Sequence, residues 1–280
     1  MTNELPKLKI PAHIYIIAIL MIIVSTTLFL YWSNKTISVS EYTIVSETLP
    51  QEFDGFKIVQ VSDLHNARFG KDNKRLLKKI EAQNPDMIAI TGDLVDCRRT
   101  NISIALDFVE KAMEIAPCYY VCGNHERWIE DRDGFFESLK NLGVIVLADE
   151  SFTLYSQMAT INIIGLTDPD FKKYSDVTDI INELPSESYT VLLAHRPELF
   201  ESYAKADIDL VLSGHAHGGQ FRLPFLGGIF APEQGFFPKY DSGLYTKGTC
   251  NMIVSRGLGN SLFPFRINNR PEIISITLST

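Results

Sequence analysis

Residues 57–65 read Lys-Ile-Val-Gln-Val-Ser-Asp-Leu-His, an apolar run that ends in a carboxylate and an imidazole. Four further stretches repeat this form: a strand-like apolar run is followed at once by side chains that can bind a metal ion. They occupy residues 86–93, 119–126, 189–195 and 208–217. Ligands of open α/β sheets bind beyond the carboxyl ends of the strands, so we predict that the five ends meet at one site.

The positions of the histidines follow the same pattern. Five of the six follow these runs, namely His65, His125, His195, His215 and His217. A single histidine after a strand is more often a hydrogen-bonded loop residue than a metal ligand. Five in such positions, joined by Asp63, Asp93 and Asn124, instead indicate a metal centre.

The mixture of ligand types narrows the choice of metal. Imidazole and carboxylate groups suit Zn, Fe and Mn, and the set contains too much nitrogen for a calcium site. It also holds more side chains than one tetrahedral ion needs. We therefore predict two divalent ions that share one carboxylate, a pair that can clamp a phosphoryl group and generate a nucleophile near neutral pH.

Around these runs, strand-like and helix-like segments alternate and then give way to a β-rich C-terminal third. The predicted strands are 42–46, 56–62, 86–91, 117–122, 144–147, 152–155, 161–166, 190–194, 208–212, 252–255 and 272–278, and the predicted helices are 72–82, 102–114, 135–142, 177–184 and 197–204. This order predicts an α/β (α+β) fold with a large mixed sheet system and helices outside it.

Composition excludes several classes of protein. The chain has 280 residues, of which 45% are hydrophobic and 21% charged, as in globular proteins. A net charge of −8 argues against a nucleic-acid partner that binds a broad basic surface. Four cysteines are too few for a disulfide scaffold, and we expect a monomer.

The N-terminal forty residues differ from the rest. Residues 14–32 carry no charge and show no polar face, and at about 1.5 Å per residue they match the bilayer hydrocarbon thickness. We interpret them as a transmembrane helix, in preference to a cleaved signal peptide, because the apolar run is long and no small-residue cleavage site follows it. The predicted division is an N-terminal segment 1–13, a transmembrane helix 14–32, a linker 33–41 and one domain 42–280.

The lysines around this helix predict its orientation. Lys7 and Lys9 precede the helix and Lys35 follows it. Under the positive-inside tendency, this places the N-terminus in the cytoplasm and the domain outside, in a single-pass protein of the cell membrane.

The ordered series Asp-x-His, Gly-Asp, Gly-Asn-His-Glu, His and Gly-His-x-His over residues 56–217 resembles the calcineurin-like metallophosphoesterase superfamily. Gly-Gly-Gln-Phe-Arg-Leu-Pro from residue 218, Ser-Arg-Gly-Leu-Gly from 255 and the C-terminal Asn-Arg-Pro-Glu-Ile-Ile-Ser-Ile further resemble its membrane-anchored bacterial phosphodiesterase branch. The resemblance implies two mixed β-sheets packed as a sandwich and flanked by helices.

The resemblance also implies roles for single residues. Asp63, His65 and His217 would bind one metal ion, Asn124, His195 and His215 the other, and Asp93 would bridge the two. His125 would give a proton to the leaving group, a task that suits the pKa of an imidazole. The implied activity is hydrolysis of a phosphate ester, most simply a diester, through in-line attack by a metal-bound hydroxide.

The sequence is also compatible with three other functions. One is pyrophosphate cleavage in a glycolipid of the UDP-diacylglucosamine type. Another is protein phosphatase activity, although the motif at 92–98 departs from the phosphatase pattern at Cys97 and Arg98. The third is a non-catalytic, metal-binding membrane adaptor, although such degenerate proteins usually lose ligands that are all present here. The membrane helix favours a lipid-linked or cell-envelope phosphate ester as the substrate.

The sequence offers two alternative roles for several other residues. Arg196 and Arg256 are candidate phosphate contacts or ordinary ion-pair partners. Glu126 either orients a neighbouring histidine or has a structural role. The phenylalanine-rich stretch 218–245 is expected to pack over the sandwich, with an apolar rim for lipid as the alternative.

Overall fold

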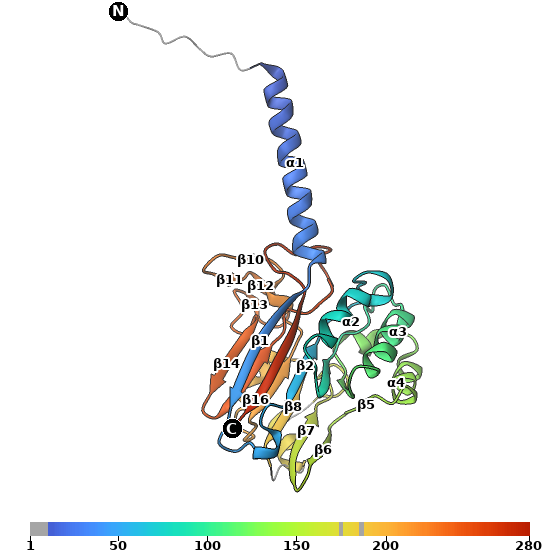
Figure 1. The fold of residues 1–280 in the computed structure, drawn as a ribbon, viewed down its shortest axis with the longest axis vertical. Coiled ribbons are helices and arrows are strands. Elements are labelled where there is room, and N and C mark those ends of the chain that lie inside the picture. Colours follow the sequence, from blue (N-terminus) through green and yellow to red (C-terminus); the bar gives the residue numbers. More distant parts are fainter. Residues whose placement is uncertain (1–10, 174–175, 185–187) are drawn as a thin grey trace, which may run out of the picture.

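The computed structural model describes residues 11–173, 176–184 and 188–280. They form two six-stranded mixed sheets packed face to face, with helices on the outer faces and one long helix that projects from the domain (Figure 1). The predicted fold class is confirmed. Most of the predicted N-terminal segment, including Lys7 and Lys9, lies outside the described residues.

The first sheet has the strand order β1-β16-β2-β3-β4-β5. Its strands are β1 (Ser38–Val45), β2 (Lys57–Val61), β3 (Met87–Thr91), β4 (Cys118–Val121), β5 (Ile145–Val146) and β16 (Glu272–Ser279). Strand β1 runs parallel to β16, which is antiparallel to β2, and β2 to β5 are parallel to one another. The carboxyl ends of β2, β3 and β4 therefore lie at the same end of the sheet as the first residues of β1.

The second sheet has the order β14-β15-β9-β8-β7-β6. Its strands are β6 (Glu150–Ser156), β7 (Ala159–Gly165), β8 (Thr190–Leu193), β9 (Leu210–Ser213), β14 (Gly243–Lys247) and β15 (Cys250–Val254). The four central strands are parallel, and both edge strands are antiparallel to their neighbours. The strands predicted before the C-terminal third are thus confirmed, with shifts of a few residues at their ends.

Three apolar layers hold the domain together. The central layer joins the inner faces of the two sheets, with Ile58 and Ala89 of the first sheet packed among side chains such as Val191 and Leu212 of the second. A second layer lies under helices α2 (Lys74–Glu81), α3 (Ile102–Met113) and α4 (Arg132–Asn141), and a third lies under α5 (Val177–Glu183) and α6 (Phe200–Tyr203). Burial of both sheet faces explains why the central strands are apolar throughout.

Helix α1 (Ala12–Lys35) is about 36 Å long at 1.5 Å per residue and has no buried face, apart from Ser33 at its end. It is the one helix among the described residues that is long and apolar enough to cross a membrane. The predicted linker 33–41 is wrong, because α1 continues to Lys35 and β1 begins at Ser38. Ser33, Asn34 and Lys35 are the last residues of the helix, and residues 38–41 are the first of an edge strand that is half exposed.

The stretch between β9 and β14 forms two short hairpins. Strands β10 (Arg222–Leu223) and β11 (Gly227–Gly228) make the first, and β12 (Phe230–Ala231) and β13 (Gly235–Phe236) make the second. The expectation that the phenylalanines here pack over the sandwich holds for Phe221 and Phe230, which are half-buried. It is wrong for Phe225, Phe236 and Phe237, whose side chains are exposed because the packing of the two short hairpins leaves them uncovered.

Candidate active site

The first sheet brings Asp63, Asp93 and Asn124 together at the carboxyl ends of β2, β3 and β4. These strands are adjacent and parallel, so each delivers its terminal side chain to the same edge. Asp63, His65 and Asp93 have positive φ angles of 52°, 44° and 53°. Non-glycine residues avoid this region, and their presence here shows that the surrounding structure imposes the turn that aims these side chains at the site.

The second sheet supplies the remaining histidines. His195 follows β8, and His215 and His217 follow β9, again with positive φ at the last two. The five strands that the sequence singled out therefore do not lie side by side in one sheet. Three come from the first sheet and two from the second. The site lies where the carboxyl ends of these strands in the two sheets face each other.

One group of ligand atoms consists of Asp63, His65 and His217. The two imidazole Nε2 atoms are 3.1 Å apart, and His217 Nε2 lies 3.4 Å from Asp63 Oδ1. All three residues are buried. The guanidinium of Arg266, itself fully buried, lies 3.2 Å from the outer nitrogen, Nδ1, of His217.

A second group consists of Asp93, His195 and His215. His195 Nδ1 donates to the carbonyl of Thr91 at 2.7 Å, which leaves its Nε2 free to bind a metal. His215 is oriented in the reverse way, because its Nε2 donates to Glu233 at 2.5 Å and its Nδ1 faces His195 Nε2 at 3.1 Å. Each imidazole is thus held in one tautomer by an acceptor outside the group.

Asp93 lies between the two groups. Its Oδ2 is 3.5 Å from His65 Nε2 and 3.3 Å from His195 Nε2, so one oxygen faces an imidazole of each group. Its other oxygen, Oδ1, accepts the backbone N–H of His125 at 2.8 Å. This is the position in which a carboxylate can contact two ions at once.

Two glycines permit this close approach. Gly92 has φ +89°, and a Cβ there would lie 2.6 Å from Nδ1 of His195. A Cβ on Gly214 would overlap the Ser62 hydroxyl and the Asp63 carboxylate. Any larger side chain at either position would push a ligand out of place.

The chemistry of these residues fits metal ions. Oδ1 of Asn124 is buried and finds no hydrogen-bond partner among the described residues, which is unfavourable unless another group binds there. Burial alone would raise the pKa of the Asp63 carboxyl, but the imidazoles of His217 and His65 outweigh it and hold that pKa below its usual range. The site therefore combines ionised carboxylates with open donor atoms, as a cation site requires.

His125 stands beside these groups and faces the pocket. Its Nδ1 accepts the backbone N–H of Cys97 at 3.2 Å, so the neutral ring carries its proton on Nε2. That Nε2 lies 3.1 Å from the hydroxyl of Ser261. Burial lowers the pKa of His125 to about 4, and the negative charge of Asp93 only partly counteracts this effect.

Glu126 does not orient a histidine. Its carboxylate accepts the backbone N–H groups of Asp93, Gly123 and Val95 at 2.9 to 3.1 Å. It therefore ties the loop after β3 to the loop after β4, which is the structural role considered for it. Burial, followed by the nearby charge of Asp93, raises the pKa of Glu126 to about 8.

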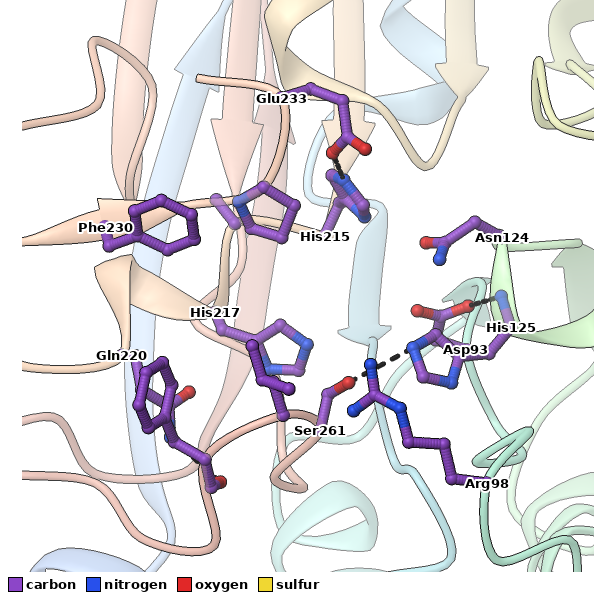
Figure 2. Close-up of a pocket in the computed structure, with 14 residues that line it drawn as sticks. Asp93, Arg98, Asn124, His125, His215, His217, Gln220, Phe230, Glu233 and Ser261 are labelled. Carbon is purple, nitrogen blue, oxygen red and sulfur yellow. Dashed lines mark hydrogen bonds and ion pairs between the residues drawn. The ribbon is translucent and has the colours of Figure 1, made fainter. Parts of the chain in front are cut away.

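A pocket of about 280 Å³ is lined by Asp93, His215 and His217, so members of both groups reach it (Figure 2). Asp93, Asn124, His125, His215 and His217 form its polar floor. Its remaining lining consists of Arg98, Ala216, Gln220, Phe230, Pro232, Glu233, Ser261, Leu262 and Phe263. Arg98 is exposed and carries the positive charge at the rim.

Neither predicted arginine contact lines this pocket. Arg196 is buried and makes a bidentate ion pair with Asp168, with Nη1 3.2 Å from Nε2 of His215. Arg256 donates to Glu272 at 2.6 Å and to the hydroxyl of Ser38 at 2.9 Å. Both fill the ion-pair role that was the alternative for them.

The sequence reasoning missed four residues of the site: Arg98 and Ser261 in the pocket, Glu233 behind His215, and Arg266 behind His217. Arg98 belongs to the motif at 92–98, and a cation beside a phosphate-binding motif is a signal that the sequence does carry. The other three lie in loops without periodicity and carried no local signal.

The family model of the calcineurin-like phosphoesterases matches residues 56–219, which span all seven predicted metal ligands. The chain belongs to this family. It is 31% identical to the metallophosphoesterase YkuE of Bacillus subtilis over 89% of this chain and 88% of that one. It is 32% identical to the phosphodiesterase YaeI of Escherichia coli over 80% and 82% of the two chains.

Two further similarities complete this comparison. A zebrafish protein named as a transmembrane protein with a metallophosphoesterase domain is 31% identical over 86% of this chain and 57% of its own length. The sulfate thiohydrolase SoxB of Thermus thermophilus shares the fold, with a TM-score of 0.50 and 12% identity over 82% of this chain and 57% of that one. Family membership and the clustered ligands make this chain a metal-dependent phosphoric ester hydrolase.

Proposed function

We propose that this chain is a phosphodiesterase with two divalent metal ions, Mn, Fe or Zn. Asp63, His65 and His217 hold one ion, and Asn124, His195 and His215 hold the other. The position of Asp93 Oδ2 between imidazoles of both groups carries this proposal. When bound, the ions supply a nucleophile at neutral pH and offset the charge of the phosphate. The name of the Escherichia coli relative supports a diester as substrate.

The protein groups around the pocket position the ester. Arg98 offers a guanidinium that can bind a phosphate oxygen through two N–H groups. His125 carries its proton on Nε2, and a hydrogen bond from that nitrogen stabilises the negative charge that develops on the oxygen of the leaving group. The hydroxyl of Ser261 keeps the ring of His125 turned towards the pocket.

Helix α1 anchors the domain in the cell membrane as a single span. Its length and apolar surface support this role, as does the name of the zebrafish relative. The lysine pattern supports an orientation with the domain outside the cytoplasm. A monomer with its site tied to the bilayer in this way suits a lipid-linked or cell-envelope phosphate ester.

Turnover by the full chain in detergent with Mn²⁺ tests the activity. We expect hydrolysis of bis-p-nitrophenyl phosphate, with the rate proportional to bound metal. His125→Ala should slow esters with an alkoxide leaving group by about 10²- to 10⁴-fold, and nitrophenyl esters far less, because nitrophenolate leaves without a proton. His13→Ala, which changes the histidine of α1, should alter neither rate.

Two bound ions without turnover of any mono- or diester would contradict this proposal and favour the metal-binding adaptor. Orientation is tested separately by labelling Met158→Cys, a fully exposed position, in intact cells with a reagent that does not cross membranes. Labelling only after lysis would contradict the outward placement and leave the enzymatic proposal intact.

A further inference from the structure

Nine exposed large apolar side chains gather beside the base of α1. They are Leu223, Phe225, Leu226, Phe236, Phe237, Leu262, Phe263, Phe265 and Ile267, with exposed fractions from 37% to 107%. We call this set the apolar lip. Figure 1 shows its hairpins, β10–β11 and β12–β13, at the end of the domain from which α1 projects. Exposed apolar patches of this kind mark interaction surfaces in soluble domains.

The lip is one built surface and not a set of independent loops. The ring of Phe221 packs against Phe263 and Phe265, with ring centroids 5.4 and 5.5 Å away. The side-chain amide of Gln220 donates to the carbonyl of Phe265 at 2.7 Å. These contacts join the hairpin segment to the segment 261–267.

The same segment is attached to the end of α1. The backbone N–H of Arg266 donates to Asn34 Oδ1 at 2.7 Å, and Asn34 Nδ2 donates back to the carbonyl of Arg266 at 3.0 Å. The guanidinium of Arg270 lies 5.2 Å from the centre of the Trp32 ring and donates to the carbonyl of Thr36 at 3.1 Å. The last turn of α1 is thus held on the lip by paired hydrogen bonds.

The register of the first sheet places the catalytic groups at this end as well. Ser40 of β1 pairs with Ile274, and Ile274 pairs with Gln60 of β2. Asp63 is three residues beyond Gln60, so the same register places it level with residue 37. Residue 37 is two residues, or about 7 Å along the strand direction, from the end of α1 at Lys35. Leu262 and Phe263 of the lip also line the pocket.

We propose that the apolar lip docks on the lipid bilayer that α1 enters and holds the mouth of the pocket in the headgroup layer. The proposal rests on the membrane anchor proposed above. A bilayer is the occupant because the lip continues directly from the membrane-proximal turn of α1, with Trp32 and Arg270 at the junction. An ester in a lipid headgroup would then reach the pocket without leaving the membrane surface.

Depth measurements on the full chain in nanodiscs of phosphatidylethanolamine and phosphatidylglycerol test the docking. An environment-sensitive fluorophore is placed at Phe225→Cys or Phe237→Cys, and a nitroxide is placed on the lipid headgroups. We expect severalfold stronger quenching at both sites than at Met158→Cys, an exposed apolar position in the β6–β7 turn. The unsubstituted chain, with Cys97 half-buried and its other cysteines buried, gives the background.

Each alternative leaves a different signal. Equal quenching at positions 225 and 158 would overturn the docking. An apolar emission at 225 without quenching would also overturn it and would show that protein, such as a second copy of the chain, covers the lip. Turnover of bis-p-nitrophenyl phosphate on the same nanodiscs reports the proposed activity independently. Failure to enter nanodiscs would contradict the anchor itself.

Kinetics test the consequence for substrate access. Phe225→Asp combined with Leu226→Asp changes the tip of the first hairpin, outside the pocket lining. We expect severalfold slower turnover of phosphatidyl-p-nitrophenol in vesicles and unchanged turnover of bis-p-nitrophenyl phosphate. Met158→Asp should change neither rate. Equal losses on both substrates would show that the tip supports the pocket and does not dock.

Discussion

The two ligand groups have similar donor atoms but are supported in different ways. His217 of the first group is backed by Arg266, which is fully buried and whose backbone is bonded to Asn34 of α1. His215 of the second group is backed by Glu233, whose side chain is half exposed. One half of the site is therefore built into the membrane-proximal core, and the other is supported in part by a surface carboxylate, beside the buried guanidinium of Arg196. The two halves should respond differently when their supports are removed.

The largest effect on activity is expected from substitution of Asp93, which lies between the two ligand groups. Asp93→Ala removes the oxygen that faces both groups, and we expect the rate on bis-p-nitrophenyl phosphate to fall by more than about 10³-fold. Elemental analysis should show that metal is lost from both groups. Asp86→Ala, which changes the carboxylate before β3 instead of the one after it, is the matched control and should keep both ions. Retention of two ions by Asp93→Ala would contradict the shared position.

Removing the buried support of the first group should affect the whole domain. Arg266→Met leaves the carbonyls of Arg256 and Gly259 without the guanidinium that donates to them. Buried acceptors without donors are costly, so the free energy of unfolding should fall by about 3 kcal/mol. Denaturant unfolding of the full chain in detergent measures this loss. Unchanged stability would show that Arg266 serves only His217.

Removing the exposed support of the second group should affect activity alone. Glu233→Gln keeps the shape but weakens the acceptor for His215 Nε2, and we expect an activity loss of about 10- to 100-fold. Excess metal should restore part of the rate, and the free energy of unfolding should stay near that of the unsubstituted chain. Glu201→Gln, an exposed glutamate outside the site, is the control. A loss of stability equal to that of Arg266→Met would remove the distinction between the two halves.

The smallest effect is expected at the rim, where Arg98 belongs to neither group. Arg98→Ala should raise KM about tenfold and leave kcat nearly unchanged, because one charged hydrogen-bonding contact to the phosphate is lost. Arg99→Ala is the matched control, since the neighbouring Arg99 does not line the pocket and pairs with Asp96. A loss confined to kcat would show that Arg98 acts on the transition state and not on binding.

The candidate ligands could be predicted from the sequence because each closely follows one of five strands. Asp63, Asp93 and Asn124 come directly after apolar runs, and the direction of a parallel strand fixes which edge its last residue reaches. The supports could not be predicted in the same way. Glu233 and Arg266 reach their histidines from loops 18 and 49 residues along the chain, and no local periodicity marks a contact of that kind.

The apolar lip shows the same limit. Phe221 and Phe225 lie four residues apart in one phenylalanine-rich stretch, yet the first packs against Phe263 and Phe265 and the second is exposed. Composition indicated an apolar segment but not which side chains would be covered. That depends on tertiary contacts, which place two rings from the segment 261–267 on Phe221 and none on Phe225 among the described residues.

From the sequence alone came most of the strands, the seven candidate metal ligands, the apolar N-terminal helix and the family. Each of these features is encoded by a short continuous stretch of sequence, because burial and strand direction act on neighbouring residues. The division of the ligands between two sheets, their supports, and the placement of the site beside the end of α1 were decided by tertiary structure. These features depend on how β1, β16 and β2 pair and on contacts across more than two hundred residues, such as that between Asn34 and Arg266.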